Sequence, residues 1–211
     1  DREGTGVYEL LVEEEPLSSI VQKVAGFPHL ECAPANQELA GAEISMVNMV
    51  ARESILKLAL NDYLKEREAQ GDRLDYIIID CPPSLGLLTV NALTAAEEVL
   101  VPIQCEYYSL EGISLLMETL AKIKRALNPR VHVSTIVLTM FDSRTRLAND
   151  VANDVRAHFP KELIDIPIPR AVRVSEAPSF KQTVMTYDAA SPGAIAYMQV
   201  AREIALRSSS P

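Results

Sequence analysis

The residue best suited to chemistry in this chain is an aspartate that follows a short apolar run. Two prolines come shortly after it. The apolar run is Tyr76–Ile79, the aspartate is Asp80, and Cys81 separates it from Pro82 and Pro83. A short run rich in β-branched residues predicts a strand buried on both faces. Prolines cannot donate to a β-ladder, so we expect the strand to end at Asp80.

A carboxylate in that position suits a hydrated magnesium ion beside a nucleotide phosphate. In open parallel α/β sheets, ligands bind just outside the carboxyl ends of the strands. Magnesium keeps several waters and takes one or two carboxylates together with substrate phosphates. The residues alone also allow a plainer interpretation, in which Asp80 is only a strand-end cap or turn residue.

The elements that would position Asp80 alternate between strand and helix along the chain. We expect strands at Tyr76–Asp80, Glu98–Gln104, Val131–Met140 and Leu163–Ile168, with a shorter one at His29–Ala33. We expect helices after Thr5, at Leu17–Val24, Ala51–Ala69, Gly86–Ala96, Ser109–Leu127, Thr145–Phe159 and Ser191–Arg207. This alternation predicts βαβ units and a mostly parallel sheet with helices on both faces. Right-handed crossovers would then place Asp80, Gln104, Met140 and Pro169 along one rim.

Length and composition favour one α/β domain over residues 1–211 with a sizeable core, since 48% of the residues are hydrophobic. No apolar run is long enough to span a bilayer, and the first residues lack the apolar segment of a signal peptide. Cys32, Cys81 and Cys105 are scattered, which argues against a disulfide framework or a zinc site and for a reducing cytoplasm. We expect Cys81 to be a buried, inert thiol rather than a nucleophile.

Charge is segregated along the chain. Residues 1–120 carry 7 Lys and Arg against 21 Asp and Glu, a net −14, whereas residues 121–211 carry 13 against 8, a net +5. Most of the basic residues in the second part are arginines: Arg125, Arg130, Arg144, Arg146, Arg156, Arg170, Arg173, Arg202 and Arg207. This pattern permits a phosphate-binding face on an acidic body, although ordinary solvated helix positions would give the same count.

Four blocks, in order, resemble the ParA/Soj family of chromosome-partitioning ATPases. They are Tyr76–Gly86, Val101–Gly112, Leu138–Leu147 and Ile168–Ser179. The resemblance implies a doubly wound P-loop NTPase fold, of which this chain would be the C-terminal major part. It also implies ATP-dependent homodimerisation, DNA binding without sequence preference, and hydrolysis stimulated by a ParB-like partner, all in the cytoplasm on the nucleoid.

The same resemblance assigns roles to individual residues. Asp80 would be the catalytic carboxylate and would hold magnesium through water, and Cys81–Asn91 would be a switch that senses the γ-phosphate. The nucleotide would lie against Asp80, Pro82, Thr139, Met140 and Pro169. DNA would contact Arg144, Arg146, Arg170, Arg173 and Lys181. Arg144 and Arg146 flank Thr145, the expected helix cap, where basic residues oppose the helix dipole; this favours phosphate contact over a purely stabilising role.

The sequence departs from that family in one respect. None of its eight glycines is followed by lysine, so the glycine-rich phosphate loop and its lysine do not appear. We therefore expect the first βαβ unit of the fold to be missing. ATP or ADP with magnesium would be cofactors of the intact protein, and this chain would bind no nucleotide tightly and would be inactive as an ATPase.

Two other functions fit part of the pattern. A MinD-like positioning ATPase would act on membranes through a C-terminal amphipathic helix, but the segment Ala201–Arg207 has few bulky apolar anchors, so we expect no membrane partner. A non-catalytic module that retains a DNA- or partner-binding surface is the other alternative.

Overall fold

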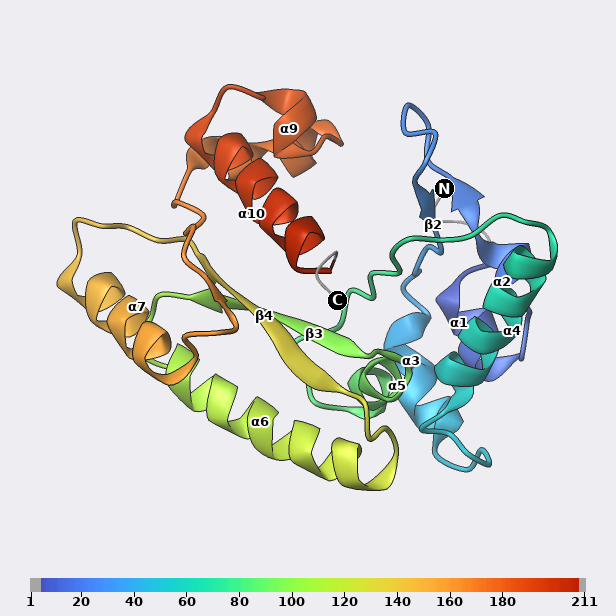
Figure 1. Cartoon of the computed structure of the whole chain (residues 1–211). Helices are drawn as coiled ribbons and strands as arrows, with labels where there is room; N and C mark the ends of the chain where they lie inside the picture. Colours follow the sequence, from blue (N-terminus) through green and yellow to red (C-terminus); the bar gives the residue numbers. More distant parts are fainter. Residues whose placement is uncertain (1–4, 209–211) are drawn as a thin grey trace. The chain divides into compact units, whose positions relative to one another are not determined.

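The computed structural model describes residues 5–208 and divides the chain into two compact units (Figure 1). The first unit comprises residues 5–97 and Thr119–Val131. The second unit comprises Glu98–Glu118 and residues 132–208. Helix α6 (Ser109–Ala126) runs from the second unit into the first.

The second unit contains a three-stranded parallel sheet with the order β3-β4-β5. Its strands are β3 (Glu98–Gln104), β4 (His132–Thr139) and β5 (Leu163–Ile164). Helix α6 follows β3, and helix α7 (Arg146–His158) connects β4 to β5. The parallel α/β arrangement predicted from the alternation of strands and helices is confirmed.

Successive residues of β4 bury opposite faces of this sheet. Ile136 and Leu138 pack into a core cluster with α7 and the first half of α6, whereas Val137 packs with residues of α10 (Pro192–Ser208). Figure 1 shows α6 and α7 on one side of β4 and α10 on the other. Because both faces are covered, the strand is a continuous apolar run. Each fully buried aliphatic side chain contributes about 1.5–3 kcal/mol through the water-exposed area that it removes.

The remaining elements of the second unit are short. They are α8 (Val172–Glu176), the 3₁₀ helix η1 (Ala177–Phe180) and α9 (Val184–Tyr187). Ala177 and Val184 pack with Ala194 of α10 in a small core cluster of their own. This cluster fixes the segment that follows Pro169 against the last helix.

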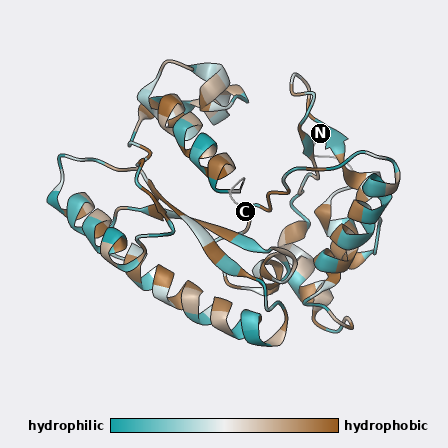
Figure 2. Ribbon diagram, viewed as in Figure 1, coloured by the Kyte–Doolittle hydropathy of each residue, from teal (hydrophilic) through white to brown (hydrophobic). Residues whose placement is uncertain are grey.

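The first unit is mostly helical. Its elements are α1 (Val7–Val12), α2 (Leu17–Ile20), β1 (Gln22–Lys23), β2 (Glu31–Cys32), α3 (Leu39–Met46), α4 (Ile55–Ala69) and α5 (Leu87–Ala95). Strands β1 and β2 pair antiparallel. The side chains of Leu10, Ile20 and Met46 are at most 1% exposed and form the centre of its core. Figure 2 shows the banding of hydrophobic and hydrophilic residues on α4, the longest helix of this unit.

Polar side chains join elements of the first unit. The Arg67 guanidinium of α4 lies 2.7 Å from the Glu31 carboxylate of β2 and 2.8 Å from the Asp72 carboxylate. Asn91 of α5 is 1% exposed; its amide donates to the Arg52 carbonyl at 2.7 Å, and its oxygen accepts from the Leu56 N–H at 3.1 Å. Asn91, the last residue of the expected switch segment, is therefore a buried residue that joins α5 to the start of α4.

The prediction of a strand at Tyr76–Asp80 is wrong for the described structure. In the described structure this segment belongs to no ladder, and the side chains of Ile77 and Ile78 are 43% and 91% exposed. A strand exists only through hydrogen bonds to a neighbouring strand, and the described residues supply none for this segment. An apolar run indicates a tendency to form a strand, but hydrogen bonding to a neighbouring strand decides whether the strand forms.

Two helix starts also differ from their predictions. Helix α1 is capped by Gly6 rather than Thr5, because the Glu9 carboxylate accepts from the Gly6 N–H at 2.6 Å. Helix α4 begins at Ile55 rather than at Ala51, since Ala51 has a left-handed φ of 53° that a helix cannot contain.

Candidate functional site

The candidate site lies in the second unit, where β3 and β4 end side by side. Gln104 pairs in register with Thr139, and the Thr139 hydroxyl donates to the Ile103 carbonyl at 3.2 Å. Met140 follows with a left-handed φ of 51°, which is uncommon for a residue with a side chain. The chain therefore turns sharply at the carboxyl end of the sheet.

A second loop is hydrogen-bonded to this turn. The Phe141 N–H donates to the Ile168 carbonyl at 3.0 Å, and the Arg170 N–H donates to the Phe141 carbonyl at 3.0 Å. These two bonds form an isolated parallel bridge between Phe141 and Pro169. The predicted rim is thus confirmed for Gln104, Met140 and Pro169, whereas the prediction is wrong for Asp80, which ends no strand in the described structure.

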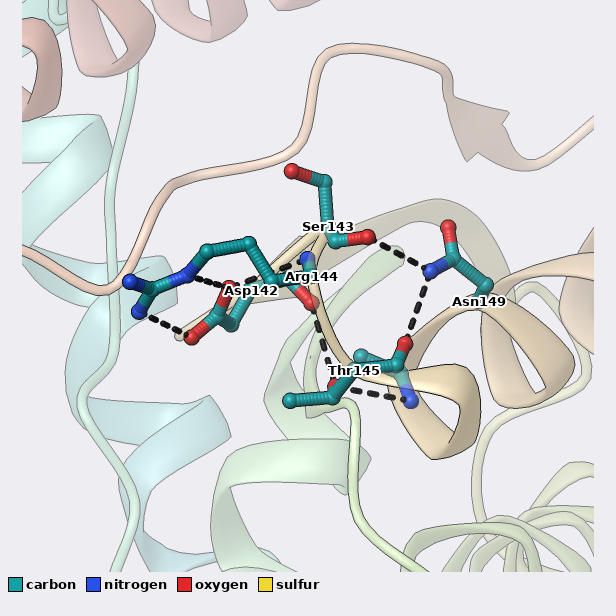
Figure 3. A network of polar contacts seen from close by, with 6 residues as sticks. Asp142, Ser143, Arg144, Thr145 and Asn149 are labelled. Carbon is teal, nitrogen blue, oxygen red and sulfur yellow. Dashed lines mark hydrogen bonds and ion pairs between the residues drawn. The ribbon is translucent and has the colours of Figure 1, made fainter.

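A carboxylate organises the next turn, as Figure 3 shows. Asp142 accepts from the Arg144 backbone N–H at 3.1 Å, and its two oxygens accept from the Arg144 guanidinium at 2.9 and 2.7 Å. These hydrogen bonds, with the positive charge of Arg170 as a lesser contribution, lower the pKa of Asp142 to about 2. Asp142 therefore stays ionised at every physiological pH.

Thr145 caps α7, as the sequence predicts. Its hydroxyl accepts from the Ala148 N–H at 3.3 Å, and the Asn149 side chain donates to the carbonyls of Ser143 and Thr145 at 2.9 and 2.7 Å (Figure 3). Arg146 then stands at the first helical position with a side chain 94% exposed, paired only loosely with Asp150 at 3.5 Å. The cap stabilises the helix start, whereas the positive charge of Arg146 opposes the dipole there.

The loop after Pro169 supplies a second group of cations. Arg173 pairs with Glu176 at 3.1 Å and with Asp188 at 3.5 Å, and its guanidinium lies 5.9 Å from the centre of the Tyr187 ring. The hydrogen bond to Glu176 raises the pKa of Arg173, so it stays charged. Lys181 ends η1 in a left-handed conformation with φ 55°.

The acidic partners of these arginines are the residues that sequence reasoning missed. Asp142, Glu176 and Asp188 pair with Arg144 or Arg173. The spacing of Asp142 and Arg144, two residues apart in a turn, is typical of an Asx turn and is a signal available in the sequence. Contact between Arg173 and Asp188 depends on the fold, so nothing local predicts it.

Asp80 and Pro82 belong to the first unit, in an irregular and exposed stretch. Among the described residues the Asp80 carboxylate has no hydrogen-bond or ion-pair partner, and no three acidic, histidine or cysteine side chains converge there to hold a metal. Cys81 is exposed, so the prediction of a buried thiol is wrong. Crowding by neighbouring atoms and the charge of Asp80 nevertheless raise the pKa of Cys81, which keeps the thiol protonated at neutral pH.

Comparison with known proteins identifies the family. A family model described as an AAA domain matches residues 1–133. The chain is 44% identical over 201 residues to the chromosome partitioning protein ParA of Myxococcus xanthus, covering 95% of this chain and 68% of that protein. It is 44% identical over 199 residues to the sporulation initiation inhibitor protein Soj of Bacillus subtilis, covering 94% of this chain and 76% of that protein. The chain belongs to the ParA/Soj family of chromosome-partitioning ATPases.

Solved structures agree with a P-loop NTPase fold for this ParA/Soj family member. A cobyrinic acid a,c-diamide synthase from Mycobacterium smegmatis with bound ADP and magnesium matches with a TM-score of 0.73 and 33% identity, covering 92% of this chain and 69% of that one. The septum site-determining protein MinD from Pyrococcus horikoshii, complexed with Mg-ADP, matches with a TM-score of 0.69 and 19% identity, covering 97% and 74%. At that identity the second match shows the fold alone.

Within residues 5–208, no helix combines the length and the apolar character needed to cross a membrane.

Proposed function

We propose that this chain carries the DNA-binding surface of a ParA-type partitioning ATPase, formed by the second unit around the carboxyl end of β4. The single observation that carries the proposal is the convergence of cationic side chains on two hydrogen-bonded loops. Arg144 and Arg170 both act on Asp142, and the hydrogen bonds between Phe141 and the 168–170 loop hold their backbones together. Arg146, Arg173 and Lys181 extend the set and are exposed.

Exposed arginines on loops suit phosphate contacts that carry no sequence information. Arg144 and Arg146 have side chains 86% and 94% exposed; Asp142 holds Arg144 by two hydrogen bonds, whereas Asp150 holds Arg146 only through a loose surface ion pair at 3.5 Å. DNA phosphates can replace such partners, because exposed ion pairs are weak and are screened by salt. Binding of this kind falls steeply with salt and is indifferent to base sequence.

The nucleotide role of the intact protein is part of the same proposal. Thr139, Met140 and Pro169 adjoin the arginine loops in the second unit and would lie against the base, whereas Asp80 and Pro82 would serve the phosphate end. A single exposed carboxylate fits a magnesium ion that keeps its waters and takes its other ligands from phosphates. ATP would drive dimerisation, and a ParB-like partner would stimulate hydrolysis on the nucleoid.

The decisive experiment measures DNA binding by fluorescence anisotropy, with two duplexes of unrelated sequence over a salt series. Arg170 and Lys181 have no ion pair among the described residues, so Arg170→Glu/Lys181→Glu removes cations without freeing a buried acid. We expect this variant to lose at least about tenfold in affinity for both duplexes and to reduce the salt slope by about 2, roughly one per lost phosphate contact.

The matched control is Lys122→Glu/Lys124→Glu, which makes the same charge change at exposed positions of α6. We expect it to bind DNA within about threefold of the wild type, because neither lysine belongs to the two hydrogen-bonded loops that carry the proposed surface. Equal losses for the two double variants, or a loss confined to one duplex, would contradict the proposed surface.

A further inference from the structure

The first unit contains a cavity of about 440 Å³ between α4 and the turn that joins α1 to α2. Its floor is apolar and includes Leu10, Leu17, Ile55 and Tyr63. It lies wholly within the first unit and takes no part in the DNA surface proposed above. The inference drawn from it is independent of that function.

Helix α4 presents one continuous face to this cavity. Ile55, Leu58, Asp62 and Glu66 recur at intervals of three or four residues, and Tyr63 lies four residues after Ala59 in the adjoining row, so these residues share one side of the helix. Leu58 remains 56% exposed although it lines the cavity. This side of the helix thus offers open apolar area at Leu58, next to the acidic positions Asp62 and Glu66.

Acidic side chains surround the apolar floor. Glu14 and Glu15 come from the turn after α1, and Asp62 and Glu66 come from α4. Only Asp62 has a basic partner, Lys65 at 3.0 Å, and both side chains of that pair are 76% exposed. Within residues 5–208, Glu14, Glu15 and Glu66 form no ion pair. Among the described residues, the cavity is therefore an apolar groove whose rim carries three carboxylates without ion pairs and a fourth, Asp62, paired at the surface.

We propose that this groove is the docking site for a basic amphipathic helix of a partner protein. The apolar face of such a helix would fill the floor, as amphipathic helices do in hydrophobic grooves, and its lysines or arginines would pair with the rim. Complementary charge of this kind speeds association and excludes other partners. Anionic ligands and anionic lipid surfaces are repelled by the same carboxylates, and an uncharged apolar ligand would leave them without a role.

The test uses the 211-residue chain and a fluorescein-labelled amphipathic peptide of lysine and leucine, about 18 residues or five helical turns long. Its counterpart carries glutamate at every lysine position. We expect the lysine peptide to bind with an affinity that falls as salt rises, and the glutamate peptide to bind at least about tenfold more weakly. Glu14→Lys/Glu15→Lys/Glu66→Lys should weaken binding of the lysine peptide by at least about tenfold.

The matched control reverses three exposed acids of the same unit outside the groove, in Glu38→Lys/Glu68→Lys/Asp75→Lys. It makes the same change in net charge and should keep the peptide affinity within about threefold. Leu58→Ala, which removes an exposed apolar contact without altering charge, should weaken binding and preserve its salt dependence. Circular dichroism verifies that each variant is folded, and Leu58→Ala decides the matter if the groove triple does not fold.

Three results would overturn the proposal. One is equal loss of affinity in the two triple variants, which would reduce the effect to general attraction by an acidic chain. Another is an absence of binding by the wild-type chain. The third is a concentration-dependent dimer in sedimentation velocity that the groove triple abolishes, because the occupant would then be a second copy of this chain.

Discussion

A single carboxylate, that of Asp142, determines how far the arginines at the carboxyl end of β4 are free to bind an external anion. Asp142 holds the guanidinium of Arg144 by two hydrogen bonds and lies within the field of Arg170. The loop therefore combines two functions in one residue: the backbone bond from the Arg144 N–H orders the turn, and the side-chain bonds neutralise a cation. The two functions are separable by substitution.

Asp142→Asn should increase DNA affinity, provided that the surface proposed above binds DNA. The amide oxygen can still accept from the Arg144 N–H, so the turn is retained, while the negative charge facing Arg144 and Arg170 is removed. We expect tighter binding to both duplexes and a salt slope steeper by up to about 1, because one more cation is free for a phosphate. Anisotropy titration checks this, and weaker binding with a folded protein would contradict it.

The same carboxylate predicts a pH dependence of stability. The pKa of Asp142 is lowered in the folded state to about 2 from an ordinary value of 3.8, so its contribution is fully present above pH 3.8. That contribution is lost as the pH falls through about 2, and it is modest because the arginine partner is exposed to solvent. Urea unfolding of wild type and Asp142→Asn should give a constant difference between pH 5 and 7 that shrinks below pH 4. A difference that grows on acidification would be inconsistent with a lowered pKa.

At the scale of elements, buried polar side chains connect helices to one another by hydrogen bonds that the sequence of either helix alone does not predict. Asn91 of α5 donates to the Arg52 and Leu87 carbonyls and accepts from the Leu56 N–H at the start of α4. The Asn91 side chain is 1% exposed and accepts a hydrogen bond from a backbone N–H in the first turn of α4. The Ser54 side chain, at the N-cap of α4, makes no such hydrogen bond. A role in fixing α4 against α5 follows directly from these contacts.

Asn91→Ala should lower the free energy of unfolding by roughly 2–3 kcal/mol, because it leaves buried backbone groups without partners and opens a small cavity. Urea denaturation followed by circular dichroism measures the change. Asn153→Ala, at an exposed position of α7, is the control and should stay within about 0.5 kcal/mol of the wild type. Similar costs for the two substitutions would show that Asn91 does not join the helices.

How far the sequence predicts these elements depends on whether their signals are local. Thr145 caps α7 as expected, and α10 begins at Pro192, one residue after the predicted Ser191, because capping and the first-turn preference of proline depend only on neighbouring residues. The Tyr76–Asp80 run fails as a strand because pairing is a property of two segments. The rim positions of Gln104, Met140 and Pro169 follow from the alternation of strands and helices, whereas the contact between Arg173 and Asp188 joins two segments and has no local signal.

At the scale of the whole molecule, the sequence segregates charge, and the structure assigns each kind of charge a surface. The acidic groove lies in the first unit, and the cations around Asp142 and Arg173 lie in the second. The second unit as a whole carries 9 Lys and Arg against 12 Asp and Glu, a net −3, so its cations are concentrated only locally, around Asp142 and Arg173. Net charge alone would exclude nucleic acid, whereas its distribution favours two different partners.

DNA binding and ATP hydrolysis should be separable in this 211-residue chain. Hydrolysis of ATP requires successive backbone N–H groups and a lysine around the phosphates, and none of the eight glycines here precedes a lysine. Because loss of even one oriented donor can cost about 10²–10³ in rate, we expect no magnesium-dependent phosphate release above a buffer blank. DNA retention should persist, since the arginine loops lie in the second unit and do not include Asp80. Phosphate release that Asp80→Asn abolishes would sink this prediction, and DNA binding that required ATP would show that the arginines act only in a nucleotide-bound dimer.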